Sequence, residues 1–320
     1  MSAVIIDNLS LAFGKGAKQV QALDGVSLAL EPGVVLGIVG ESGSGKSTLG
    51  FALGRLMPDG VRPASGTVQV FGQDIWTLGD SQLRDLRNHT LRYVFQDPIA
   101  TLNPTRRVGV QLAEAVNPPA SDAQVIAALE EVGLPDPARV ARSWPHELSG
   151  GMAQRVTIAM AFIANPRLVV ADEATSALDA SVRTRILDLL RARARATGAT
   201  LILISHDLWA VRSYSDQVAV MYGGRIVEHG PSAEVFASPR HPYTRALLAA
   251  TPGHERQGES LATIPGAASP LHGPSPGCAF APRCTLAQAG LCDVQRPILD
   301  FPSADRSLLC HRWRDTAGDA

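Results

Sequence analysis

The sequence predicts an α/β protein with a mostly parallel sheet at its centre, and three apolar runs indicate this fold class. The runs cover residues 34–39, 168–171 and 200–204. Strands that are buried on both faces of a parallel sheet have such continuous apolar sequences. Helix-compatible segments follow the first two runs, at 49–56 and at 180 to about 195, and ligands of open α/β sheets bind at the carboxyl ends of the strands. We therefore expect the functional residues directly after these runs.

Composition and charge exclude several classes of protein. The chain has 320 residues, enough for about two domains, and 45% of them are hydrophobic. Lys and Arg (29) nearly balance Asp and Glu (30), so no strong positive field recruits nucleic acid. No apolar segment reaches the roughly 20 residues that span a bilayer, and residues 1–11 lack the pattern of a signal peptide. We expect a protein that stays in the cytoplasm.

Residues 40–48, GESGSGKST, have the spacing of a phosphate-binding loop between an apolar run and a helix-compatible segment. Glycines tolerate the positive φ angles that turn successive N–H groups toward a phosphate. Lys46 is expected to reach the β- and γ-phosphates, and the Ser47 hydroxyl to bind Mg²⁺. The sequence thus predicts binding of a nucleoside triphosphate. The residues expected to contact it are Gly40, Ser42, Gly43, Gly45, Lys46, Ser47 and Thr48.

Two other regions surround this loop in the sequence. Residues 4–11 and 25–30 alternate as strands of an N-terminal antiparallel β-subdomain, and Phe13 lies near their turn, where it either stacks on adenine or simply packs. A helical insertion is expected at about 100–165, because its helical segments are separated by Pro and Gly. Its last helix follows Ser149, Gly150 and Gly151. Such a helix start suits an anion, although alone it is an ordinary cap.

Polar residues follow the predicted strands at one edge of the sheet. Asp172 and Glu173 end a buried strand, where Asp172 would hold Mg²⁺ through water and Glu173 would act as general base. Gln96 follows another strand, and its amide oxygen can coordinate Mg²⁺ or orient water. His206 follows a third strand and can donate a hydrogen bond to a γ-phosphate. Each residue alone is more often structural, but together they indicate a hydrolytic site.

In this order and spacing the motifs resemble the nucleotide-binding subunit of ATP-binding cassette (ABC) transporters, over about residues 3–250. The stretch LSGGMAQR separates this family from other phosphate-loop ATPases. The motifs are GESGSGKST, Gln96, LSGGMAQR at 148–155, LVVADE at 168–173, SALD at 176–179 and His206. Ala174 stands where the family more often has proline, and Val34 where it often has glutamate. Neither departure removes a catalytic group, so we expect a competent ATPase.

The resemblance implies a head-to-tail dimer in which each ATP lies between the phosphate loop of one subunit and the Ser-Gly-Gly helix start of the other. Ser149 and Gly151 would then contact the partner's ATP. ATP binding closes such a dimer and hydrolysis reopens it. The other implied roles are coupling to membrane subunits for Gln96, a place at the dimer interface for Asp179, contact with the γ-phosphate for His206 and adenine stacking for Phe13.

Two segments resemble the importers of oligopeptides, dipeptides and nickel within this family. They are FQDPIATLNP at 95–104 and HPYTRALLAATP at 241–252. We expect a cassette over residues 1–251 and the subfamily's C-terminal extension over 252–320. The resemblance implies a second, related ATPase subunit, two permeases and an external solute-binding protein, with this chain attached to the cytoplasmic face of the membrane. Peptide is the first expected solute, and the alternatives, in order, are a nickel or other metal chelate, an opine and a sugar.

Four cysteines lie in the extension, at Cys278, Cys284, Cys292 and Cys310. Their spacing, C-x5-C-x7-C-x17-C, lacks the C-x2-C unit of common zinc fingers. Four thiolates with irregular spacing can hold a [4Fe–4S] cluster, as in some members of the subfamily. Structural zinc, with His311 as a possible fourth or further ligand, and merely buried thiols are the competing interpretations. We expect iron–sulfur before zinc.

Two functions of other classes compete with the importer. One is a soluble ABC ATPase that acts on ribosomes or DNA without a permease, but this chain has one cassette and no sustained heptads. The other is a metal sensor in which the cassette is only regulatory, but a regulatory cassette need not keep every catalytic group. The sequence therefore favours an ATP-hydrolysing subunit of an importer.

Overall fold

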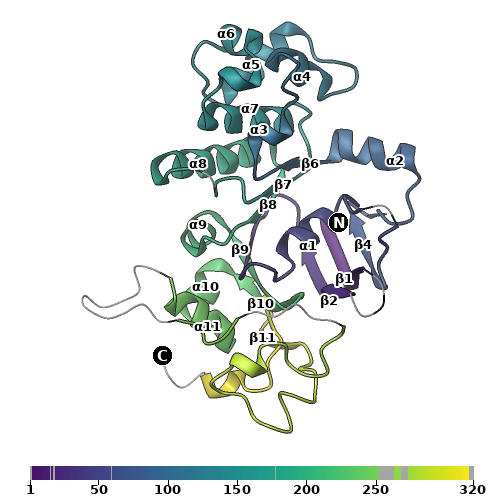
Figure 1. Cartoon of the computed structure of the whole chain (residues 1–320), viewed down its shortest axis with the longest axis vertical. Coiled ribbons are helices and arrows are strands. Elements are labelled where there is room, and N and C mark those ends of the chain that lie inside the picture. Colours follow the sequence, from purple (N-terminus) through teal and green to yellow (C-terminus); the bar gives the residue numbers. More distant parts are fainter. Residues whose placement is uncertain are drawn as a thin grey trace. The chain divides into compact units, whose positions relative to one another are not determined.

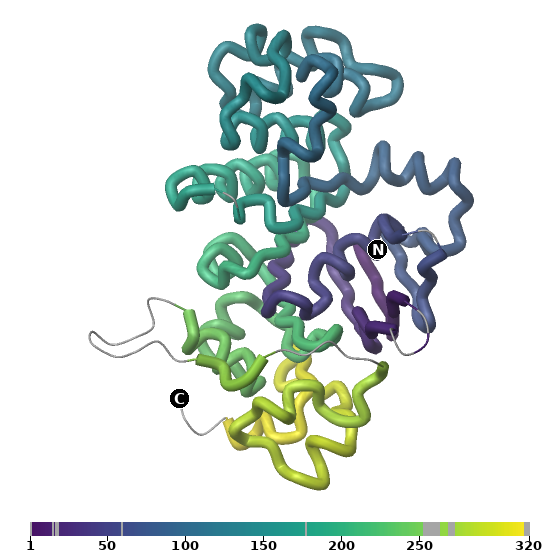
Figure 2. The backbone as a smooth tube through the Cα atoms, in the orientation of Figure 1, coloured from purple at the N-terminus to yellow at the C-terminus, as the bar shows by residue number. Residues whose placement is uncertain are grey.

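The computed structural model describes residues 2–14, 16, 19–58, 60–176, 178–251, 263–267 and 273–316 (Figure 1). The chain forms two compact units, each built from segments that are distant in sequence. The helical unit contains residues 31–35 and 77–204, and the phosphate-loop unit contains residues 2–30, 36–76 and the chain from residue 205 onward. In Figure 2 the phosphate-loop unit accordingly combines purple N-terminal segments with green and yellow C-terminal ones.

An N-terminal antiparallel sheet belongs to the phosphate-loop unit. Its strands are β1 (Val4–Phe13), β2 (Val20–Leu30), β4 (Ser65–Val70) and β5 (Gln73–Asp74). They lie in the order β2-β1-β4-β5, and Val4 pairs with Leu30 on one side and with Val70 on the other. Buried and exposed residues alternate at the start of β1, as expected for a strand with one face on the core.

A second sheet of this unit leads into the phosphate loop. Its strands are β3 (Val35–Val39), β9 (Gln217–Tyr222), β10 (Arg225–Pro231), β11 (Asp300–Ser303) and β12 (Arg306–Leu308). β3 and β9 are parallel, whereas β9, β10, β12 and β11 pair in that order and antiparallel. A Cβ on Gly37 would lie 2.2 Å from a side-chain atom of Val211, which belongs to helix α9 (Leu208–Tyr214). Glycine at position 37 therefore allows α9 to pack directly on β3.

Four α-helices of the described residues belong to this unit. They are α1 (Lys46–Ala52), α9 (Leu208–Tyr214), α10 (Ser232–Ala237) and α11 (Pro242–Ala249). Tyr243 of α11 is fully buried in a hydrophobic cluster with Val39, Val220 and Phe280. Because Phe280 belongs to the C-terminal extension, the extension and the rest of this unit share one core.

Three parallel strands form the centre of the helical unit: β6 (Leu91–Val94), β7 (Leu168–Asp172) and β8 (Thr200–Ile204). Leu91 pairs with Leu168, and Leu168 pairs with Thr200 on the other side. Every residue of β7 and β8 is buried, as predicted for strands that are covered on both faces.

The helices of this unit include the predicted insertion. They are α2 (Asp80–Asp85), a π-helical turn (Leu86–Thr90), α3 (Pro98–Thr101), α4 (Val108–Glu114), α5 (Asp122–Glu131), α6 (Pro137–Arg142), a 3₁₀ turn (Pro145–Glu147), α7 (Gly150–Phe162) and α8 (Ala180–Thr197). The predicted fold class, an α/β core with an N-terminal antiparallel sheet, a helical insertion and a C-terminal region, is therefore confirmed. None of the helices in the described part of the chain is long and apolar enough to cross a membrane.

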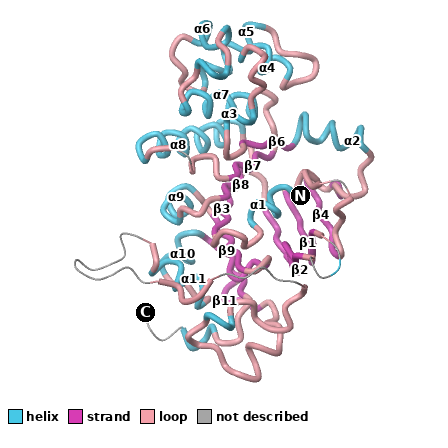
Figure 3. The backbone as a smooth tube through the Cα atoms, in the orientation of Figure 1, coloured by secondary structure: helices cyan, strands magenta, loops and turns pink. Residues whose placement is uncertain are grey.

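The described part of the C-terminal extension consists mostly of loops (Figure 3). Its regular elements are β11, β12 and two 3₁₀ turns, Ala281–Arg283 and Trp313–Thr316. β12 pairs with β10 through Leu308 and Glu228, which joins the extension to the second sheet. A domain boundary at residue 251 stays a prediction, because packing alone does not separate the extension from the phosphate-loop unit.

Candidate ATP-binding and hydrolysis site

The phosphate loop turns sharply at its three predicted glycines. Gly40, Gly43 and Gly45 have φ angles of 152°, 79° and 100°, a region that side chains rarely adopt. A Cβ on Gly40 would lie 2.2 Å from the carbonyl oxygen of Met221, and one on Gly45 would lie 2.6 Å from that of Ala22. Only glycine fits at these two positions, so the loop has the curvature that an anion-binding backbone requires.

Lys46 is buried, and its side chain lies against the backbone of the phosphate loop. Its Nζ donates hydrogen bonds to the carbonyl oxygens of Gly40 and Glu41, at 2.8 and 2.9 Å. The buried Ser44 Oγ has no hydrogen-bond partner among the described residues. An ammonium group and an unsatisfied hydroxyl on one curled loop fit a phosphate ligand, and the sequence pattern did not single out Ser44. Ser42 is exposed, whereas Ser47 and Thr48 are half-buried in the first turn of α1.

The two predicted acids end β7 in the helical unit. Asp172 is the last residue of the strand and is buried. Glu173 follows with φ 46°, a left-handed conformation that costs about 1 kcal/mol or more. Its N–H donates to the Ile204 carbonyl oxygen at 3.0 Å, and its own carbonyl oxygen accepts from the Ser176 N–H at 3.1 Å. These two hydrogen bonds maintain the strained turn. As a result, the Glu173 side chain does not continue the alternation of the β7 side chains between the two faces of the sheet.

Helix α7 begins at Gly150, after the N-cap Ser149, and so includes both glycines that the sequence placed before the helix. The Ser149 Oγ accepts a hydrogen bond from the Met152 N–H at 3.3 Å and so caps the helix. A Cβ on Gly150 would contact nothing within 4 Å, whereas one on Gly151 would lie 3.3 Å from Val182. Packing within the described part of the chain therefore does not require glycine at position 150.

Asp179 caps the next helix of this unit. Its carboxylate accepts hydrogen bonds from the backbone N–H groups of Val182 and Ser181, both at 3.0 Å, and from the Ser181 hydroxyl at 2.8 Å. These bonds, led by the one from Val182, lower the pKa of Asp179 below its usual value. An exposed carboxylate that stays ionised at a helix start suits a surface that meets a partner.

Gln96, His206 and Phe13 lie at chain turns. Gln96 is exposed between β6 and α3, where Asp97 caps α3 by accepting from the N–H groups of Ile99 and Ala100. His206 is exposed directly after Ser205, and Phe13 is half-buried at the end of β1. The structure thus divides the predicted residues between its units. Phe13, His206 and the loop belong to the phosphate-loop unit, and Gln96, Ser149–Gly151, Asp172, Glu173 and Asp179 belong to the helical unit.

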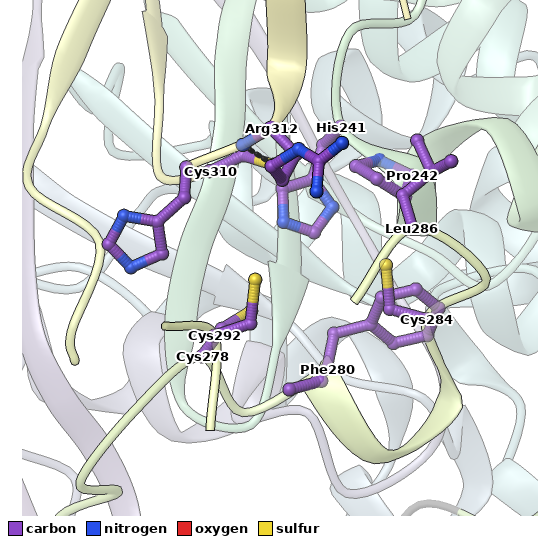
Figure 4. Close-up of a pocket in the computed structure, with 11 residues that line it drawn as sticks. His241, Pro242, Cys278, Phe280, Cys284, Leu286, Cys292, Cys310 and Arg312 are labelled. Carbon is purple, nitrogen blue, oxygen red and sulfur yellow. Dashed lines mark hydrogen bonds between the residues drawn. The ribbon is translucent and has the colours of Figure 1, made fainter. Parts of the chain in front are cut away.

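The four cysteines of the extension line one small cavity, together with Phe280 and His241 (Figure 4). Burial raises the pKa values of Cys278 and Cys284 and raises that of Cys310 to about 12. Among the described residues, however, no group of three or more His, Cys, Asp or Glu side chains is arranged to hold a metal ion. The expected [4Fe–4S] or zinc site is therefore not supported by this arrangement, although the predicted gathering of the cysteines is present.

This fold and loop define the class of phosphate-loop ATPase cassettes, and comparison with known proteins gives the family. The ABC transporter family matches residues 23–176, and the family described as "Oligopeptide/dipeptide transporter, C-terminal region" matches residues 227–292. The chain therefore belongs to the ATP-binding proteins of ABC transporters, in the oligopeptide/dipeptide subfamily. It is an ABC-type ATPase coupled to transport, as predicted.

Curated relatives match nearly the whole chain. A putative peptide import ATP-binding protein of Brucella abortus is 42% identical over 302 residues, which are 92% of this chain and 91% of the relative. The dipeptide transport ATP-binding protein DppD of Escherichia coli is 38% identical over 324 residues, 99% of both chains. Among solved structures, CbiO1 of Clostridium perfringens, part of an ABC transporter complex, has a TM-score of 0.64 and 29% identity, covering 74% of this chain and 91% of that one.

Proposed function

We propose that this chain hydrolyses ATP to drive the import of peptides through partner permeases. The observation that carries the proposal is the match of the C-terminal region to the oligopeptide/dipeptide transporter family, on a chain that also has the complete cassette. Relatives that are named for peptide or dipeptide import cover both parts of the chain. A cassette domain over residues 1–251 and an extension from residue 252 are part of this proposal.

The chain's own residues divide the work of hydrolysis. Lys46 would turn its ammonium from the loop carbonyls to the β- and γ-phosphates, while the N–H groups of the loop bind the phosphate oxygens. Ser47, Gln96 and Asp172 would hold Mg²⁺, which when bound neutralises charge on the phosphates. Glu173 would accept the proton of the attacking water, and its maintained backbone turn supports this role.

A second copy of the fold completes each ATP site in this proposal. Ser149, Gly150 and Gly151 would contact the ATP that is held by the partner's phosphate loop. The open space beside Gly150 supports this role, because no contact among the described residues requires glycine there. Asp179 would lie at the same interface, His206 would donate to the γ-phosphate, and Phe13 would stack on adenine.

The partners follow from the same assignment. They would be a second ATPase subunit, two permeases and an extracytoplasmic solute-binding protein, with this chain on the cytoplasmic face of the membrane. The segment from Gln96 to Ile99 would meet the permeases. Its Asp97 cap makes it a defined turn, and Ile99 is 46% exposed, which supports contact with another chain.

Transport by the reconstituted complex tests the proposal. The full complex in proteoliposomes, supplied with its binding protein, should take up labelled di- and oligopeptides when ATP is present. The Glu173→Gln complex should bind ATP and take up almost none. Uptake of a nickel chelate in place of peptides would transfer the assignment to metal import. Isolation of the native chain with ribosomes or DNA, and without permeases, would overturn the importer.

The cysteine cavity would hold a soft metal centre, with [4Fe–4S] ahead of zinc. Its lining supplies four thiols and no carboxylate, which suits thiolate-bound metals. Backbone N–H groups of Arg312 and Gln288 lie 3.4 and 3.5 Å from the Sγ atoms of Cys310 and Cys292, as donors to metal-bound sulfur do. Loading would require the four sulfurs to draw together. Iron, sulfide and zinc analysis after anaerobic purification tests this, and a metal-free, folded extension would overturn it.

A further inference from the structure

The C-terminal extension contacts the phosphate loop through one residue of the loop. Arg283, which precedes Cys284, donates two hydrogen bonds to the carboxylate of Glu41, at 2.6 and 3.0 Å. These residues are 242 positions apart in the sequence. The hydroxyl oxygen of Tyr243 accepts a hydrogen bond from the Glu41 N–H at 2.8 Å. Both the side chain and the backbone of Glu41 are therefore held by residues that follow the cassette's last catalytic motif.

The two groups that hold Glu41 are themselves fixed. The Arg283 side chain is 7% exposed, and its Nε donates to the Pro265 carbonyl oxygen at 2.7 Å. Its guanidinium also lies 5.7 Å from the centre of the Tyr222 ring. Tyr243 is fully buried, with ring centres 4.7 Å from Tyr222 and 5.2 Å from Phe280. Neither group can follow a displaced Glu41 without disturbing this packing.

Glu41 in turn fixes the functional end of the loop. Its carbonyl oxygen accepts hydrogen bonds from the Lys46 Nζ at 2.9 Å and from the Ser44 N–H at 3.2 Å. The position of Glu41 therefore sets where Lys46 and the Ser44 amide lie before a phosphate arrives. Preorganised donors bind an anion more tightly, because binding then costs less reorganisation.

The negative charge of Glu41 is a second reason why Arg283 affects ATP binding. Glu41 places a carboxylate in a loop that binds a triphosphate, and like charges in a site of low dielectric repel strongly. A bidentate arginine neutralises that carboxylate and fixes its direction. Without Arg283, the loop would carry an uncompensated negative charge beside its anionic ligand.

We propose that Arg283 and Tyr243 are positioning residues of the phosphate loop, and that through Arg283 the C-terminal extension is a functional part of the ATP site. The proposal rests on the proposed nucleotide site and adds to it Arg283 of the extension and Tyr243 of α11, near the end of the cassette. Arg283 acts on the charge and direction of Glu41, and Tyr243 acts on its backbone. Neither residue needs to touch the nucleotide.

Equilibrium binding of a fluorescent ATP analogue to the full-length chain, with Mg²⁺, tests the proposal. Arg283→Gln should raise the Kd about tenfold, because it leaves the Glu41 charge unpaired. Adding Glu41→Gln to Arg283→Gln should recover most of that loss, since the repelling charge is then gone. Tyr243→Phe should raise the Kd about threefold through the lost acceptor. Arg314→Gln is the matched control, because it removes an exposed extension arginine, which pairs with Asp300.

The recovery by Glu41→Gln separates positioning from a general loss of structure. If Arg283→Gln binds ATP like the wild type, or if the double variant binds no better than the single one, the proposal is wrong. Thermal melting of each variant identifies one that fails to fold, and Arg283→Lys, which keeps the charge, should then still bind within about threefold of the wild type. If the wild-type protein binds no ATP, the proposed nucleotide site is wrong. This outcome differs from failure of the positioning proposal, in which the wild type binds ATP and the variants do not change the Kd as expected.

Discussion

Arg306→Met should strongly destabilise the attachment of the extension. The Arg306 guanidinium pairs with the Glu228 carboxylate, and their side chains are 5% and 0% exposed. Removing one member of such a buried pair costs about 3–5 kcal/mol, because the other charge remains buried. Glu228 would keep the backbone N–H groups of Arg240 and His241, at 2.8 and 3.0 Å. We therefore expect the lower end of the range, about 3 kcal/mol in the free energy of unfolding.

Urea unfolding of the full-length chain, followed by circular dichroism, measures this change, and limited proteolysis with mass spectrometry locates the segment that loosens. The matched control is Arg314→Met, because Arg314 is 69% exposed and its pair with Asp300 should contribute about 0.5 kcal/mol or less. Adding Glu228→Gln to Arg306→Met should recover part of the stability, since no buried charge is then left unpaired. A loss below about 1 kcal/mol for Arg306→Met would refute the reasoning, because the pair would then behave like a solvated one.

Three further perturbations should give defined results. Glu173→Gln should keep ATP binding and lower ATP turnover by at least about 100-fold, in a phosphate-release assay; unchanged turnover would remove it as the base. Gly40→Ala should abolish ATP binding, because its Cβ would lie 2.2 Å from the Met221 carbonyl oxygen. Gly43→Ala is the control: its Cβ would have no described atom within 4 Å, so this variant should bind ATP more tightly than Gly40→Ala. Burial lowers the pKa of His229, so the unfolded chain gains a proton first and stability should fall as pH drops below about 6.5. The share of His229 is at most about 1.4 kcal/mol per pH unit, and His229→Gln should reduce the slope by that share in thermal melts at pH 5.5 to 7.5. Part of the slope should remain, because burial also lowers the pKa of His241, to about 3.

Much of the fold could be predicted because its signals are local. The continuous apolar runs that become β3, β7 and β8 record burial on both faces, and the glycines of the phosphate loop record its curvature. The sequence also predicts a helix cap in the stretch Ser149–Gly151, because capping depends on neighbouring residues, and Ser149 is the cap. The roles of the motif residues in binding and hydrolysis stay predictions that the variants above test.

Other features of the site depend on distant contacts and leave no local pattern. The left-handed conformation of Glu173 is maintained by a hydrogen bond to Ile204 on the neighbouring strand. No sequence pattern near Glu173 predicts this hydrogen bond. The pairing of Glu41 with Arg283 spans 242 positions, and a Glu in a loop or an Arg beside a Cys has no distinctive spacing. The four cysteines line one cavity, but their spacing in the sequence does not determine how their sulfurs lie.

The charges on the extension indicate why it binds in one arrangement. Three of its arginines each meet an acid of the same unit: Arg283 meets Glu41, Arg296 meets Asp24, and Arg306 meets Glu228. Desolvation makes such pairs weak sources of stability, yet a displaced extension would leave the buried Glu228 carboxylate without its arginine at considerable cost, whereas Asp24 would keep Arg225 at 2.8 Å. Misplaced arrangements are therefore disfavoured even in a segment with little regular structure. The same pairs bring Arg283 to the phosphate loop, so the ATP site has its correct shape only when the extension is correctly attached.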